Sequence, residues 1–343
     1  MMKRNSTLDI LKGICLIVVI TTHFQWSAEE RLRYLFPFWV DMAIPLCMLI
    51  SGYLFSKSFI KKEINTISKA YSLKGGIIDR LIRYTVPFVI AYAVEVVAFD
   101  VLGYRDFPTV LDLLKEFMRG GDGSGSYYYP VLFQLVFVFP LIYFCIERRG
   151  TKGLILCCIA NVVYELLQWA YGLESQTYRL LVFRYILLLS FGCYFGLGGK
   201  LNKVAAVCMF VVGILGVILN SYHGITLFFI TYWTRTSCLT ALFMVPMFFY
   251  LLKLDIHFPP LELIGKASYN VFLVQMVFYR FAASFFYNRI SNRCILYLLF
   301  VTICLAGGII FYYVETPITD ACIKFSRKMI QYYQKRSVSK NQV

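Results

Sequence analysis

The stretch "LDILKGICLIVVITTHFQW", from Leu8 to Trp26, is apolar enough to cross a bilayer as a helix, yet it carries an Asp, a Lys and a His. About 20 predominantly apolar residues span the roughly 30 Å hydrocarbon core. A charged side chain at the centre of such a helix costs about 2.5–3.5 kcal/mol on insertion scales. These three polar groups therefore need partners or a function, and the stretch predicts a first transmembrane helix with a polar face.

The rest of the chain is equally apolar. Of its 343 residues 59% are hydrophobic and only 15% are charged, and the mean hydropathy is +0.67. The apolar runs are continuous and do not alternate, which favours helices over a barrel. We predict an all-α, polytopic membrane bundle of about ten transmembrane helices. The expected spans lie near 8–26, 37–56, 84–102, 127–146, 153–172, 180–198, 204–222, 226–252, 268–288 and 294–314.

The net charge of +15 is explained by the position of the basic residues. If the first helix starts inside, Lys and Arg concentrate in the expected cytoplasmic segments, above all 57–83 and the C-terminal tail. This bias predicts an N-in/C-in topology with an even number of spans. The charge then reflects topology and contact with anionic membrane lipids rather than nucleic acid. We expect a multi-pass protein of the plasma or inner membrane.

The chain divides into a membrane domain, 1–322, and a basic cytoplasmic tail, 323–343. The cytoplasmic segment 57–83 has basic and apolar residues at helical spacing, which predicts an amphipathic surface helix. The outer segment 103–126 ends in a Gly- and Ser-rich hinge, "RGGDGSGSYYY". Two interpretations stay open for this hinge, a cover over an outward-facing site and a plain flexible connection.

The eleven cysteines lie in or beside apolar segments and show no metal-ligand spacing. They are typical of small packing residues in a membrane bundle. We expect no metal site and no disulfide framework.

Polar side chains of the first helix share one face. Lys12 and His23 are eleven residues apart, which places them about 20° apart around the helix and about 16–17 Å apart along it. Asp9 lies three residues before Lys12, within side-chain reach. In one interpretation Asp9 and Lys12 form an interfacial pair and His23 extends to the outer headgroups. In the other, a water-accessible channel lets His23 take and return a proton.

Five stretches together resemble the membrane acyltransferase-3 family over nearly the whole chain, from Arg4 to Pro317. "RNSTLDILKGICLIVVITTH" is similar to the opening motif, in which a basic residue precedes a histidine. "FPFWVDMAIPLCMLISGYLF" resembles the second-helix motif, and "RLIRYTVPF" the R-x-x-R motif. "LIGKASYNVFLVQ" is similar to the ninth-helix motif and "YYVETP" to the final Glu-x-Pro. One departure is Gln275, where many relatives have His, so any role of this side chain is reduced to hydrogen bonding.

The resemblance implies a ten-helix fold and transfer of an acyl group from cytoplasmic acyl-CoA to a hydroxyl of a cell-surface or lipid-linked glycan. The donor expected first is acetyl-CoA, with no metal. His23 would be the base that takes the proton from the sugar, and passage of the acyl group through His23 is the less favoured variant. The implied catalytic residues are His23, Asp9 and Glu315.

The same resemblance assigns the coenzyme A phosphates to Lys12, Arg80 and Arg83. Guanidinium groups suit phosphates well, whereas simple positive-inside anchors are the competing interpretation. Lys12 adds to this phosphate site or pairs with Asp9. Glu315, just before Pro317 where the last helix is expected to stop, pairs with a basic residue or is an ordinary carboxylate at the water boundary.

Other polar residues are expected deep in the bundle, with Glu165–Arg184 and Glu95–Arg235 as candidate ion pairs. The aromatic residues expected at the outer face are either sugar-stacking platforms or parts of an aromatic belt, namely Trp169, Tyr127 to Tyr129 and Trp233. Two other functions compete with acyl transfer. A transporter or flippase for lipid-linked sugars also needs polar groups at mid-membrane, although no internal repeat supports it. A structural or sensory membrane protein would tolerate Lys in place of Arg80 and Arg83.

Overall fold

The computed structural model describes residues 5–72, 76–101 and 109–340, and within these ranges every regular element is helical. Predicted features at 1–4, 73–75 and 102–108, including Arg4 at the start of the family match, lie outside the described residues. The α-helices are α1 (Ser6–His23), α2 (Ala28–Arg33), α3 (Phe36–Trp39), α4 (Ala43–Lys61), α5 (Ile67–Tyr71), α6 (Ile77–Val101), α7 (Val110–Arg119), α8 (Tyr128–Arg149), α9 (Thr151–Tyr171), α10 (Ser175–Leu180), α11 (Ile186–Gly196), α12 (Lys203–His223), α13 (Met244–Leu251), α14 (Pro259–Lys266), α15 (Ser268–Phe281), α16 (Ala283–Tyr287) and α17 (Arg293–Lys340). Three short 3-10 turns join them, η2 (Val182–Tyr185), η3 (Thr234–Thr236) and η4 (Thr240–Phe243).

The prediction of an all-α membrane bundle is confirmed. Eight helices in the described ranges are long and apolar enough to cross a membrane. Two expected spans are shorter, since the sixth is the apolar stretch Val182–Gly196 and the ninth is the 14-residue helix α15 followed by α16. The total of ten crossings therefore stays a prediction.

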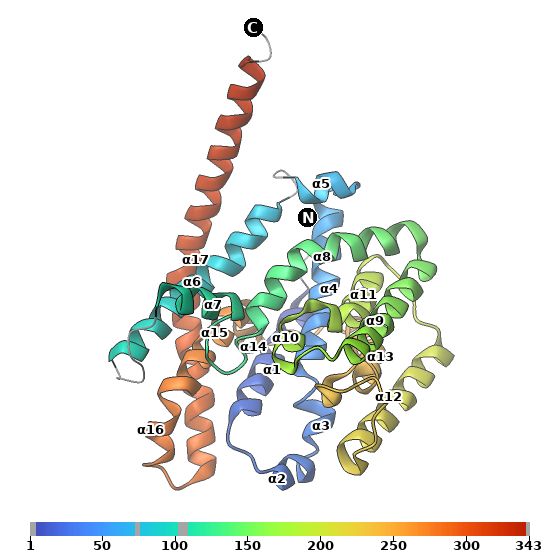
Figure 1. Cartoon of the computed structure of the whole chain (residues 1–343), viewed down its shortest axis with the longest axis vertical. Helices are drawn as coiled ribbons and strands as arrows, with labels where there is room; N and C mark the ends of the chain where they lie inside the picture. Colours follow the sequence, from blue (N-terminus) through green and yellow to red (C-terminus); the bar gives the residue numbers. More distant parts are fainter. Residues whose placement is uncertain (1–4, 73–75, 102–108, 341–343) are drawn as a thin grey trace.

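The long helices alternate in direction. Thr21 near the end of α1 hydrogen-bonds Tyr297 near the start of α17, with 2.7 Å between the hydroxyl oxygens, so these helices run antiparallel. Ser58 near the end of α4 accepts a bond from Arg80 near the start of α6. In Figure 1 α5 and the C-terminal part of α17 lie at one end of the bundle, and α2, α3 and α16 lie at the other. This arrangement is the one that an N-in/C-in topology requires, and the assignment of the cytoplasmic side stays a prediction.

Burial separates central from peripheral helices. In α1, 72% of the residues in the 18-residue apolar stretch are buried, whereas in α12 22% of the corresponding stretch is buried. Val204 and Val207 of α12 are exposed on its outer side, as expected of a helix that faces lipid. The polar face of α1 therefore lies inside the bundle, where its groups meet other helices.

One of the closest helix contacts joins α4 and α11. A Cβ on Gly52 would lie 2.2 Å from the Leu189 carbonyl oxygen, and a Cβ on Gly192 would lie 2.1 Å from that of Leu49. Small residues allow membrane helices to approach this closely, because dispersion contacts replace the hydrophobic effect that is absent in lipid. Ser51, beside Gly52, is thereby held on a rigid wall of the interior.

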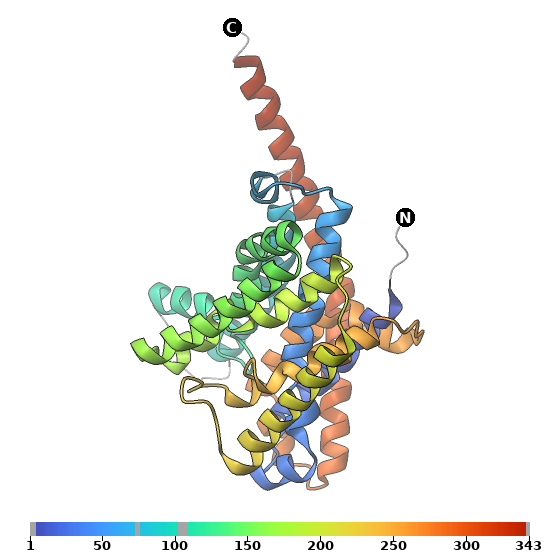
Figure 2. The same ribbon diagram turned by 90° about the vertical axis from the view of Figure 1, so that its right-hand side faces the viewer.

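Two sequence-based expectations about helix limits are wrong. The last helix does not stop at Pro317, because α17 continues through it to Lys340 and projects beyond the other helices (Figure 2). Proline removes one backbone hydrogen bond, and helices that are otherwise well formed accommodate this loss. In the described part of the segment 57–83, the amphipathic helix is shorter than expected, since the five-residue helix α5 lies between the ends of α4 and α6. The domain division at residue 322 coincides with no break in α17 and stays a prediction.

Candidate active site

His23 lies at the end of α1 and faces a cavity of about 450 Å³, which we name the outer cavity after the predicted topology. The helix ends there because Phe24 is extended, with ψ 149°. The imidazole packs against Tyr279, with ring centroids 5.8 Å apart. No described residue hydrogen-bonds to either ring nitrogen, so the imidazole is available to a group in the cavity. The other polar residues that line this cavity are Thr22, Arg31, Asp41, Tyr127, Arg179, Trp233, Thr234, Arg235 and Thr236.

A glycine-rich loop covers the same imidazole. Gly125 has φ +88°, and a Cβ built on it would lie 3.5 Å from His23 Nε2 and 3.2 Å from the ring of Phe272. This backbone conformation is accessible to glycine at little cost. Of the two interpretations of the hinge, the structure favours the cover over a site.

Two helices anchor this loop. The N–H of Asp122 donates to Glu95 Oε1 of α6 at 2.9 Å, and the Asp122 carboxylate pairs with Arg280 of α15 at 2.8 Å. Gln275 Nε2, also in α15, donates to the Ser124 carbonyl at 3.1 Å. Gln275 thus has the hydrogen-bonding role to which its side chain is limited. The loop is fixed on both sides, so Gly125 is held beside His23.

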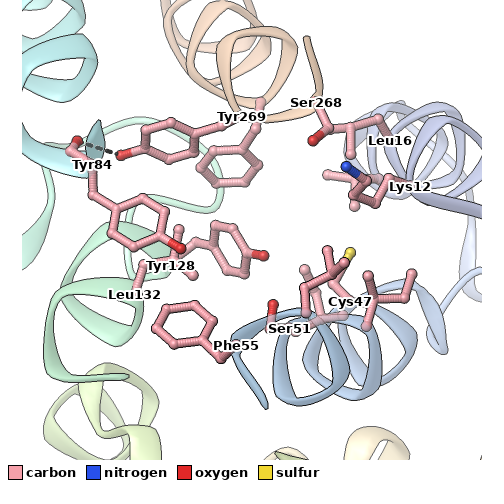
Figure 3. Close-up of a pocket in the computed structure, with 15 residues that line it drawn as sticks. Lys12, Leu16, Cys47, Ser51, Phe55, Tyr84, Tyr128, Leu132, Ser268 and Tyr269 are labelled. Atoms are coloured by element: carbon pink, nitrogen blue, oxygen red, sulfur yellow. Dashed lines mark hydrogen bonds between the residues drawn. The ribbon is translucent and has the colours of Figure 1, made fainter. Parts of the chain in front are cut away.

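An inner cavity of about 220 Å³ lies deeper along α1, and Lys12 lines it. In Figure 3 the polar ends of Lys12, Ser51 and Ser268 come from three different helices and point toward the open centre. Asp9 binds Lys12 Nζ at 2.7 Å. Most of the remaining lining is apolar or tyrosine. The predicted Asp9–Lys12 pair is present, and it lies at the inner cavity rather than against His23.

The two cavities adjoin. Val19, Ile44 and Phe272 line both. These apolar side chains lie where the cavities meet, between the Lys12 level and the His23 level, and we call this place the constriction. A group that passes from one cavity to the other must pass these side chains.

Arg80 lies on the inner side of this system, near the ends of α4 and α6. Its guanidinium stacks on Phe59 at 4.6 Å and on Phe55 at 5.3 Å, and Nη2 donates to Ser58 Oγ at 3.2 Å. Phe55 also lines the inner cavity. Arg80 is therefore one aromatic ring away from that cavity and does not line it directly.

More basic side chains surround Arg80, and sequence reasoning missed two of them. Asp79 accepts two bonds from Arg327, the shorter at 2.6 Å, and lies 3.9 Å from Lys62 Nζ. Arg83 pairs with Asp320 at 3.5 Å. Lys62 is still 38% exposed, and its partial burial first, and then the positive charge of Arg80, lower its pKa. Lys62 was one of many basic residues in its segment, and Arg327 lay in the presumed tail. No motif in the sequence therefore distinguished either residue as a neighbour of Arg80.

Comparison with protein families assigns the chain. A family model described as an acyltransferase domain, that of the acyltransferase-3 family, matches residues 5–314. The chain belongs to this family. Comparison with curated proteins and with solved structures gave no match. The matched range includes His23, Lys12 and Arg80, together with both cavity walls, so the apolar bundle is a membrane acyltransferase.

Glu315 of this acyltransferase does not take a basic partner. Its carboxylate accepts a bond from Asn270 Nδ2 at 2.9 Å and another from Thr319. No lysine or arginine of the described ranges lies within 4.0 Å of it. A buried carboxylate can be satisfied by neutral donors as well as by a cation. Glu315 thereby fixes Asn270, which follows Tyr269 of the inner cavity wall.

The two other candidate ion pairs of the acyltransferase are also absent from the described residues. Glu165 accepts both of its contacts from the Tyr178 hydroxyl, and Arg184 stacks on the ring of Tyr178 at 5.2 Å. Glu95 binds the glycine-rich loop, and Arg235 lines the outer cavity. The sequence predicted these residues as buried polar groups. In the structure the partner of Glu165 is a tyrosine hydroxyl and the partner of Glu95 is a backbone N–H. The described ranges contain no group of three potential metal ligands.

Proposed function

We propose that this acyltransferase moves an acyl group, most simply acetyl, from cytoplasmic acyl-CoA to a hydroxyl of a cell-surface or lipid-linked glycan. One observation carries the proposal. His23 and Lys12, on one face of α1, open into adjoining cavities, the outer one under the Gly125 loop and the inner one next to Arg80. This arrangement supports a donor that enters from one side of the membrane and an acceptor that enters from the other.

The chemistry at the outer cavity is a general-base step. Neutral His23 removes the proton from the acceptor hydroxyl while that oxygen attacks the thioester carbonyl. A new C–O bond forms, the C–S bond breaks, and the proton ends on the departing coenzyme A sulfur. A positioned base of this kind contributes about 10²–10⁴-fold to the rate. Neither ring nitrogen of His23 is hydrogen-bonded to a described residue, which suits this role.

The donor end of the proposal is supported by charge. Arg80, Arg83, Lys62 and Arg327 cluster at the inner mouth, with Asp79 and Asp320 as the only carboxylates paired to them in the described ranges. Phosphates of coenzyme A carry the opposite charge and suit guanidinium donors. In this proposal the pantetheine chain extends into the inner cavity, whose lining is mostly apolar or tyrosine. Lys12, which is paired with Asp9, and Asn270, which is bonded to Glu315, then shape the donor side. We also propose the plasma or inner membrane as the location, because a cytoplasmic donor and a cell-surface acceptor would meet there.

The direct test measures acetyl transfer by the purified protein in nanodiscs, with acetyl-CoA as donor and isolated surface glycan as acceptor. His23→Ala is expected to lower transfer by about 10²–10⁴-fold while acetyl-CoA binding is retained. His223→Ala removes an exposed histidine from the end of α12 and serves as the control. Full activity of His23→Ala would exclude histidine as the base, and absence of transfer to any glycan by the wild type would exclude the function.

A further inference from the structure

The outer cavity has an excess of positive charge beside His23. Four of its lining residues are formally charged, namely Arg31, Asp41, Arg179 and Arg235. Arg31 and Asp41 neutralise one another at 2.8 Å. Neither Arg179 nor Arg235 makes an ion pair within the described ranges. Two guanidinium groups are thus left uncompensated around a space of about 450 Å³.

Some guanidinium N–H groups at this cavity have no hydrogen-bond partner among the described residues. Arg179 Nε is buried and has no hydrogen-bond partner in the described residues. Arg184 is buried behind the cavity wall, and its Nη1 also lacks a partner there. Leaving such donors unsatisfied is costly. An anion in the cavity would relieve that cost for the residue that lines it.

The same cavity wall contains a partly exposed aromatic side chain, Trp233, that suits contact with a sugar ring. Trp233 is 38% exposed and lines the cavity. Arg184 lies over its ring at 4.8 Å, and Tyr127 packs against it with centroids 5.4 Å apart. Its backbone has φ +52°, a conformation that costs bulky residues energy and concentrates at functional sites. Trp233 is therefore held in place, and its exposed part is suited to contact with a sugar.

The geometry points to an anionic acceptor: a saccharide with a carboxylate or phosphate group near the acylated hydroxyl, bound by Arg179 and Arg235 and stacked on Trp233. This inference rests on the proposed function, of which it specifies the acceptor. The cations at the inner mouth serve the donor phosphates in that proposal, so the outer arginines are left for the acceptor. Guanidinium groups recognise carboxylate and phosphate equally well.

The test measures binding without a donor, so that no reaction is needed. The probes are tetragalacturonic acid and its methyl ester, which has the same hydroxyls and no charge, together with maltotetraose carrying a 6-phosphate and plain maltotetraose. We expect the charged member of at least one pair to bind roughly tenfold or more tightly than its neutral match, with an affinity that falls as salt rises. The pair that discriminates identifies carboxylate or phosphate as the recognised group.

Variants locate the effect. Arg179→Gln and Arg235→Gln are each expected to weaken the charged probe roughly tenfold and to leave the neutral probe unchanged. Arg179→Lys keeps the charge and is expected to retain part of the affinity. Arg33→Gln is the matched control, because Arg33 is an exposed outer arginine that does not line the cavity.

Two results would overturn the inference: equal binding of the charged and neutral probes by the wild type, or no difference between Arg179→Gln and Arg33→Gln. Acetyl transfer is measured separately with the same probes. Charge-selective binding without transfer would support the anion site and contradict the proposed function. Transfer to neutral probes alone would support the function and overturn the anion site.

Discussion

Gly125 lies against the imidazole of His23, close enough that a Cβ on residue 125 would be 3.5 Å from Nε2. The glycine comes from a loop anchored on α6 and α15, and the histidine from the end of α1. The loop thus shapes the space beside His23, in which the proposed base would meet the acceptor hydroxyl.

The first prediction concerns Gly125→Ala. The added methyl group would lie 3.2 Å from the ring of Phe272, which must then move by a few tenths of an ångström, and it would occupy the space beside His23 Nε2. Because rate depends steeply on the position of reacting groups, we expect acyl transfer to fall by roughly tenfold, with donor binding unchanged. The measurement is kcat/KM for the acceptor.

Gly198→Ala is the matched control for this change. Gly198 has φ +90°, against +88° for Gly125, and nothing lies within 4 Å of its added Cβ. Both substitutions carry the same backbone penalty, about 1–2 kcal/mol, and only one reaches the site. Equal activities for the two variants would contradict a role of the loop at His23.

The second prediction concerns the anchor Glu95, which is buried and accepts the N–H of Asp122. Glu95→Ala leaves that N–H without its partner, which costs about 1–3 kcal/mol when the group stays buried. We expect amide exchange in residues 120–126 to accelerate and acetylation to decrease. Glu95→Gln keeps an acceptor oxygen and is expected to retain slow exchange. Unchanged exchange in Glu95→Ala would show that the loop is held by other contacts.

Much of the architecture was accessible from sequence because hydropathy and charge bias are properties of single segments. The shared face of Lys12 and His23 follows from helical periodicity alone, and both residues do line cavities. The glycine-rich hinge was recognisable from its composition. Its position over His23 was one of two interpretations, because sequence does not show where a loop packs.

Contacts between distant segments were not accessible in the same way. Arg327 reaches Asp79 across 248 positions, and only the continuation of α17 beyond Pro317 brings it there. For Glu315 the sequence left open a basic partner and an ordinary position at the water boundary, whereas the structure gives it Asn270 and Thr319 as hydrogen-bond donors. The constriction between the cavities consists of apolar side chains, which are indistinguishable in sequence from the rest of the membrane core.

The third prediction concerns that constriction. Phe272→Trp enlarges a side chain that lines both cavities, and the larger ring is expected to obstruct passage of the acyl group. We expect acetyl transfer to fall at least tenfold while acetyl-CoA and glycan still bind, because each cavity keeps its own polar residues. Binding and transfer are measured on the same nanodisc sample. Transfer at the wild-type rate would show that the acyl group takes another path.

The last prediction concerns the pH dependence of donor binding through Lys62, whose pKa is lowered by burial and then by the charge of Arg80. A bound phosphate favours charged lysine, so affinity is greatest below the lowered pKa and falls as pH rises through it. Lys62 therefore loses its proton at a lower pH than an ordinary lysine, whose pKa is about 10.4. We expect the affinity of the wild type for acetyl-CoA to decline as pH rises through this lowered pKa, above the range where the phosphates themselves titrate. Lys62→Arg keeps a charge that does not titrate in this range, so its affinity should decline less, whereas Lys62→Met should be weaker already at pH 7.

Lys61→Met, at an exposed neighbouring position, controls for a general loss of positive charge. Superimposable pH profiles for the wild type and Lys62→Arg would remove Lys62 from the donor site.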